Sequence, residues 1–192
     1  MTKLKFLFIS WQELHNLCFK LALKIEKENL RFDRIVCISR GGLIVARIFS
    51  DFLDLPISNF TIVSYVSVGN IGKPKIVEKL SIDIRNEKIL LIDEIVDSGI
   101  TFKKANVYLK ELSPKSITTL APVIKPWSKP KPDIWTLKTG KWVIFSYEIK
   151  ETIKDLIKIW QKNKLTHEQM KKEFFKIGLP KKQVEYFLKN NL

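Results

Sequence analysis

The chain has 192 residues, of which 45% are hydrophobic, and its 34 Lys and Arg residues exceed its 20 Asp and Glu residues, giving a formal net charge of +14. This length and apolar content provide one buried core with room for a small appendage, and they exclude a disordered chain. No stretch approaches the ~20 apolar residues of a membrane-spanning helix, so we expect a cytoplasmic protein.

Helical and strand patterns alternate through the first half of the chain. Apolar residues at intervals of three and four predict helices, and short β-branched runs predict buried strands. The expected elements are a helix over 11–28, a strand over 35–38 with a glycine turn at 39–42, a helix over 43–53, a strand over 60–68 and a mobile loop over 69–75.

The second half continues the alternation and then becomes helical. The expected elements are a strand over 89–92, a helix ending near 112, a strand over 116–123, a Pro- and Lys-rich connection over 125–132, a strand over 141–147 and helices over 151–164, 166–177 and 180–190. Repeated strand, loop and helix units indicate an α/β fold with a doubly wound, mostly parallel sheet, flanking helices and ligands at the carboxyl ends of the strands.

The charge is unevenly distributed. Residues 149–192 hold 11 Lys against 5 Asp or Glu, a net +6. We therefore expect a main domain over 1–149 and a basic helical C-terminal extension over 150–192. The total charge indicates an anionic partner, and nucleic acid, a membrane surface or a polyphosphate substrate would each satisfy it, as would a Lys-rich surface with no ligand. The two cysteines, Cys18 and Cys37, lie in apolar patterns and are predicted to be buried reduced thiols.

Three acids follow the strand at 89–92. Asp93 and Glu94 come directly after four apolar residues, a position suited to neighbouring sugar hydroxyls or to a hydrated Mg²⁺ ion. Asp97 lies in a turn that continues through Ser98, Gly99 and Thr101 into a helix, where backbone N–H groups and the helix dipole favour a phosphate monoester. Together these features predict a ribose 5-phosphate site.

The segment from Ile89 to Thr101 resembles the phosphoribosyl diphosphate fingerprint of the type I phosphoribosyltransferases, and the acid at position 97 resembles the 6-oxopurine branch of that family. The resemblance implies that Asp93 and Glu94 bind the ribose hydroxyls and a metal ion. It also implies that Asp97 faces N7 of the purine and handles its proton, while the turn through Ile100 binds the 5-phosphate.

Other stretches fit the xanthine-guanine and hypoxanthine-guanine enzymes. The resemblance implies that Ser39, Arg40, Gly41 and Gly42 form a diphosphate loop, and that Ser64 and Tyr65 belong to a flexible loop that closes over the reaction centre. It implies that Lys125 donates to O6 of the purine, that Trp142 stacks on the base and that the carbonyl of Val143 accepts from a 2-amino group. It also implies that Glu148 is an acid near a second magnesium ion.

The resemblance thus implies a purine phosphoribosyltransferase, a pentosyltransferase of purine salvage that uses phosphoribosyl diphosphate and Mg²⁺. Guanine and hypoxanthine are the expected bases, with xanthine a further candidate, and a homodimer or higher homo-oligomer is expected with no membrane partner. Two alternatives stay open. One is a regulator that senses phosphoribosyl diphosphate and binds nucleic acid through its basic tail, although the tail has almost no Arg to read bases. The other is an enzyme for adenine or a pyrimidine.

Overall fold

The computed structural model describes residues 5–67 and 70–190, and for residues 64–67 and 70–72 it describes the backbone alone. The chain forms two compact units: one holds residues 15–65 and 71–140, and the other holds the chain up to Leu14, the segment Val66–Asn70 and the chain from Lys141 on. The helices are α1 (Trp11–Lys27), α2 (Gly42–Leu53), α3 (Ile100–Glu111), α4 (Ile149–Lys162), α5 (His167–Ile177) and α6 (Lys181–Lys189). The strands are β1 (Phe6–Ile9), β2 (Arg34–Ser39), β3 (Ile57–Ser67), β4 (Asn70–Glu78), β5 (Lys88–Ile92), β6 (Ile95–Val96), β7 (Ser116–Leu120), β8 (Val123–Ile124), β9 (Leu137–Lys138) and β10 (Trp142–Phe145).

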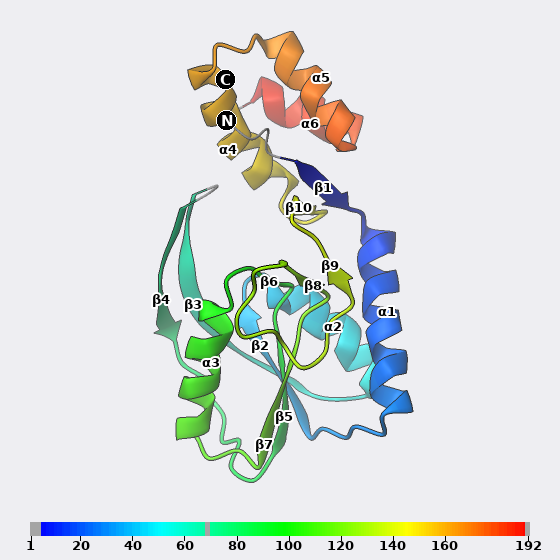
Figure 1. Cartoon of the computed structure of the whole chain (residues 1–192), viewed down its shortest axis with the longest axis vertical. Coiled ribbons are helices and arrows are strands. Elements are labelled where there is room, and N and C mark those ends of the chain that lie inside the picture. The colour runs from blue at the N-terminus through cyan, green and yellow to red at the C-terminus, as the bar shows by residue number, and fades with distance from the viewer. Residues whose placement is uncertain (1–4, 68–69, 191–192) are drawn as a thin grey trace. The chain divides into compact units, whose positions relative to one another are not determined.

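The larger unit is built on a five-stranded sheet in the order β4-β3-β2-β5-β7. The pairs β2–β3, β2–β5 and β5–β7 are all parallel. Helix α2 connects β2 to β3 and α3 connects β5 to β7, and α3 lies on one side of the sheet while α2 lies on the other (Figure 1). This arrangement confirms the predicted doubly wound α/β fold, because a parallel pair needs a crossover that carries a helix over one face.

Both faces of the central strands β2 and β5 are buried, as their continuous apolar sequences predict. On one face Val36 and Leu91 pack with Phe102 of α3 in a single hydrophobic cluster. Side chains alternate along a strand, so Cys37 and Ile92 point to the opposite face, toward α2. Both are fully buried. The two cysteines are free and buried as expected, and burial raises the pKa of each thiol to about 12.

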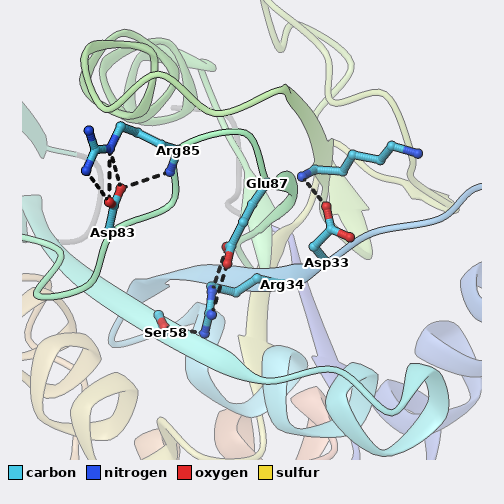
Figure 2. Close-up of polar contacts among 7 residues, drawn as sticks. Asp33, Arg34, Ser58, Asp83, Arg85 and Glu87 are labelled. Atoms are coloured by element: carbon cyan, nitrogen blue, oxygen red, sulfur yellow. Dashed lines mark hydrogen bonds and ion pairs between the residues drawn. The ribbon is translucent and has the colours of Figure 1, made fainter.

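An ion pair and a hydrogen bond to backbone connect the chain at the amino ends of β2 and β5. The Arg34 guanidinium donates to both Glu87 carboxylate oxygens, at 2.8 and 3.1 Å, and reaches Ser58 Oγ at 3.4 Å (Figure 2). Asp33 accepts a hydrogen bond of 2.7 Å from the backbone N–H of Lys88. These contacts fix the register of β2, β3 and β5 at one end of the sheet and leave the opposite end for a ligand site.

Two elements differ from the sequence prediction. The prediction of a loop over 69–75 is wrong for residues 70–75, since strand β4 begins at Asn70 and runs at the sheet edge, and residue 69 lies outside the described ranges. Pro74 is tolerated there because an edge strand does not need every N–H in a ladder. The single strand expected over 116–123 is divided. β7 stays in the five-stranded sheet, and after Ala121 and Pro122 the chain enters the small parallel sheet β6-β8-β9.

The second unit has a core of its own. β1 and β10 pair in parallel, and α4, α5 and α6 bury a cluster that includes Ile144, Leu156 and Phe174. Helix α5 begins with a capping box, because Thr166 Oγ1 accepts from the N–H of Gln169 and the Gln169 side chain accepts from the N–H of Thr166. The division into domains at 149/150 stays a prediction. No helix in the described ranges is long and apolar enough to cross a bilayer.

Candidate active site

The carboxyl ends of β2 and β5 bring two predicted loops together. The strands are neighbours with Cys37 opposite Ile92, so the glycine loop after β2 meets the acids after β5. A Cβ on Gly41 would lie 1.9 Å from Glu94 Oε2, and one on Gly42 would lie 2.7 Å from the carbonyl oxygen of Ile92. The contact at Gly42 is with backbone, so a side chain there would force the chain apart, whereas one at Gly41 would displace the Glu94 carboxyl group. The structure thus places residues 39–42 against the acidic strand end.

Asp93 and Glu94 form a crowded carboxyl pair. Asp93 is only 9% exposed, and its Oδ1 accepts from the N–H of Glu94 at 3.1 Å. Burial raises the pKa of Asp93, and burial together with the neighbouring Asp93 charge raises the pKa of Glu94 well above its ordinary value. Glu94 Oε2 is buried without a hydrogen-bond partner in the described structure. A cation or donor hydroxyls at this position would supply what the carboxyl pair lacks.

These oxygens fit Mg²⁺ rather than a transition metal. Mg²⁺ prefers oxygen ligands and usually keeps several waters, with one or two carboxylates and substrate phosphates completing its coordination. Within residues 5–67 and 70–190, no cluster of three or more His, Cys, Asp or Glu residues has a metal-binding arrangement. The pair Asp93 and Glu94 therefore suits a metal ion that arrives with an oxygen-rich substrate.

The turn after β6 leads into α3. Gly99 has φ +88°, and a Cβ there would lie 2.5 Å from the carbonyl oxygen of Lys129. Helix α3 begins at Ile100, whose N–H lies 3.4 Å from Ser98 Oγ, and Thr101 is in its first turn. The N–H groups at the start of this 12-residue helix have no intrahelical acceptor, which makes the turn suitable for a phosphate. On the neighbouring loop Ser39 Oγ accepts from Asn59 Nδ2 at 2.9 Å, and Arg40 is exposed.

The loop after β8 adds two residues that the sequence did not single out. Lys125 is 4% exposed, and burial lowers the pKa of its amine while the Asp97 charge opposes that change. The Trp127 indole N–H donates to Asp97 Oδ1 at 2.7 Å. Ser128 is buried, and its Oγ lies within hydrogen-bond distance of the carbonyl oxygens of Val96 and Asp97. The sequence feature that could have identified Trp127 and Ser128 is their position directly after Lys125-Pro126.

The remaining predicted residues are described separately from this cluster. The side chains of Ser64 and Tyr65 lie outside the described residues, although β3 contains their backbone. Three others belong to the second unit. Trp142 packs against the core of that unit, Val143 is buried, and Glu148 Oε1 accepts from the N–H of Phe145 at 2.9 Å. Their roles toward a ligand stay predictions.

Comparison with known proteins gives one consistent result. Residues 10–152 match the family described as the phosphoribosyl transferase domain. A xanthine-guanine phosphoribosyltransferase of Gluconobacter oxydans is 30% identical over 144 residues, covering 73% of this chain and 83% of that protein. A hypoxanthine-guanine phosphoribosyltransferase of Aquifex aeolicus is 34% identical over 107 residues, covering 52% of this chain and 59% of that protein. The crystal structure of a purine phosphoribosyltransferase from Pyrococcus horikoshii matches with a TM-score of 0.66 and 28% identity, over 74% of this chain and 93% of that one.

Proposed function

This chain belongs to the phosphoribosyl transferase domain family, and we propose that it is a purine phosphoribosyltransferase of purine salvage. It transfers the 5-phosphoribosyl group of phosphoribosyl diphosphate to a 6-oxopurine, giving a nucleoside monophosphate and diphosphate. Guanine and hypoxanthine are the bases we assign to it, with xanthine as a third. The relatives that act on these bases by name support the assignment.

One observation links this proposal to particular residues. The buried Asp93 and Glu94 pair lies against the Gly41 loop, and the phosphate-type turn that begins α3 follows directly along the chain. Sugar hydroxyls, a diphosphate and a 5-phosphate are the three polar parts of phosphoribosyl diphosphate. We assign them to the carboxyl pair, to residues 39–42 and to the turn through Thr101, respectively.

The proposed reaction is a displacement at C1 of the ribose. A purine nitrogen forms a bond to C1, the bond from C1 to the diphosphate oxygen breaks, and the diphosphate leaves with the bonding electron pair. Positive charge develops on the sugar, and Arg40 faces the negative charge that builds on the leaving group. Asp97 takes up the proton of the purine as a general base. Holding both reactants in line and preorganising the charges around them are the two main sources of catalysis in such a site.

We assign Mg²⁺ to the Asp93 and Glu94 oxygens together with those of the substrate. When bound, the ion neutralises diphosphate charge and orients the sugar. Burial raises the pKa values of both carboxyl groups. A cation beside them lowers those pKa values, because it favours the ionised forms.

Base selection is assigned to Lys125. A 6-oxo group accepts a hydrogen bond from its amine, whereas the 6-amino group of adenine is itself a donor and leaves the pair unmatched. We also assign base stacking to Trp142, a carbonyl contact to Val143, a second metal contact to Glu148 and closure over the site to Ser64 and Tyr65, following the family resemblance.

The regulatory alternative has no observation in its favour. In the second unit, the Trp160 and Phe174 ring centroids lie 4.7 Å apart, and Phe174 is fully buried in the core of that unit. Trp160 and Phe174 therefore have a structural role within their own unit.

The proposal is tested by a panel of bases. Guanine, hypoxanthine, xanthine, adenine, uracil and orotate are each supplied with phosphoribosyl diphosphate and Mg²⁺, and diphosphate release is measured. We expect release with guanine and hypoxanthine and little with adenine, uracil or orotate. Release with none of the six overturns the enzyme assignment, and release with adenine alone overturns the role of Lys125.

A further inference from the structure

Trp127 lies beside Asp97 and Lys125, two of the residues that we assign to the purine. Its indole N–H donates to Asp97 Oδ1 at 2.7 Å, and Lys125 Nζ lies 5.9 Å from the centroid of its ring. The residue is 53% exposed, so burial in a core does not hold it in place. The hydrogen bond to Asp97 fixes the direction in which the indole N–H points.

The loop that carries Trp127 is anchored without the indole. Ser128 Oγ accepts from the N–H of Lys125 at 3.0 Å and lies 2.7 Å from the carbonyl oxygen of Val96 and 2.6 Å from that of Asp97. The N–H of Lys129 donates to the carbonyl oxygen of Ser98 at 3.0 Å. These contacts join the loop to the β6 strand end through the Ser128 hydroxyl and the Lys129 backbone, and none of them involves the indole. Removing the indole N–H therefore leaves the loop in place.

We propose that Trp127 is a positioning residue for purine recognition, an inference that rests on the proposed function. An indole N–H is a donor only, and its bond to a carboxylate is charge-assisted. This hydrogen bond holds Asp97 Oδ1 and leaves Oδ2 to accept the purine proton. The same ring borders the Lys125 amine, so one side chain sets the spacing between the proton acceptor and the donor to O6. A proton acceptor held in one rotamer avoids the cost of ordering it when the base binds.

The first test replaces Trp127 with Phe, which keeps an aromatic ring and removes the N–H. We expect kcat/KM for guanine to fall about 10- to 100-fold, the range for loss of a hydrogen bond to a charged group, while KM for phosphoribosyl diphosphate changes less than about 2-fold. W11F is the matched control, because Trp11 is 55% exposed and belongs to the other unit. Equal effects of W127F and W11F, a faster W127F enzyme, or a parallel loss of affinity for both substrates overturns the proposal.

A double-mutant cycle tests whether Trp127 acts through Asp97. In the D97A background W127F should reduce kcat/KM by less than about 2-fold, because the acceptor of the indole is already absent. A merely structural role predicts the same fold-loss in both backgrounds, and that result overturns the proposal.

The third measurement does not depend on turnover. The indole N–H resonance of Trp127 is assigned by its absence in W127F, and it should lie downfield of the Trp11 resonance and move upfield in D97A. If the wild-type protein turns over no base while this shift is present, the proposed function fails and the contact of Trp127 with Asp97 stands. If turnover is normal and the resonance is unchanged in D97A, the positioning role fails alone.

Discussion

Asp97 has one oxygen held by the Trp127 indole, which identifies it as an oriented carboxylate rather than a solubilising surface acid. Asp97→Asn keeps the shape of the side chain and an acceptor for the indole while removing the basic oxygen. We expect kcat with guanine and hypoxanthine to fall about 10²- to 10⁴-fold, the usual contribution of a general base. Steady-state kinetics measure the loss, and the thermal midpoint should stay at that of the wild type. Unchanged turnover would show that Asp97 does not accept the proton.

Glu94 destabilises the ligand-free chain when it is ionised. Its folded-state pKa is raised well above the ordinary value by burial and by Asp93, so the native state holds the proton more tightly than the unfolded state. By linkage, the stability that protonation provides is complete below the unfolded pKa of ~4.3 and is lost as pH rises toward the folded pKa.

Glu94→Gln should therefore stabilise the protein at pH 8 in EDTA, because the neutral amide removes the cost of a buried charge beside Asp93. The gain should shrink toward pH 4. Urea unfolding at the two pH values measures it, and Glu111→Gln on the exposed surface of α3 is the control. A Glu94→Gln protein that is less stable than the wild type at pH 8 contradicts this linkage.

At the scale of single elements, two glycines with positive φ offer a matched comparison. Gly99 precedes α3 with φ +88° and faces the carbonyl oxygen of Lys129, whereas Gly178 ends α5 with φ +97°, and a Cβ added there would meet no atom within 4 Å. Both substitutions to Ala incur the left-handed penalty of about 1–2 kcal/mol. Only Gly99→Ala adds a backbone clash.

We therefore expect Gly99→Ala to reduce the free energy of unfolding by more than Gly178→Ala does, and to weaken binding of phosphoribosyl diphosphate as the turn shifts. Chemical denaturation and ligand titration measure the two effects. Equal destabilisation by the two variants would mean that the approach of Lys129 to the turn is not a tight constraint.

The elements predicted well are those with local signals. The apolar spacing from Trp11 onward predicts α1, and four apolar residues before Asp93 predict β5. The composition around the edge strand β4 predicts a loop because Gly72 and Pro74 are loop residues, and only the partner strand β3 explains why they are tolerated. The division of β7 from β8 has a similar cause, since the chain changes sheets at Pro122.

For the whole molecule, two separate hydrophobic cores predict that a mutation in one core changes the hydrogen-exchange protection of its own unit only. The cluster around Phe102 belongs to the unit with the parallel sheet, and the cluster around Phe174 belongs to the unit with α4 to α6. Phe174→Ala should cost about 3–5 kcal/mol within its own core. Hydrogen exchange should accelerate over α4, α5 and α6 while the amides of β2 and β5 keep their protection. A uniform acceleration across both units would contradict separate cores.

The succession of strands and helices, the family and the acids at the strand end can all be predicted from the sequence, because each depends on neighbours within a few residues. Which of those residues meet is a property of the folded chain. Gly41 lies against Glu94 because β2 and β5 are adjacent, and Trp127 reaches Asp97 because the chain leaves one sheet for another after β7. Such contacts join residues 30 to 53 positions apart in the sequence. They depend on strand order and side-chain packing, which no local spacing encodes.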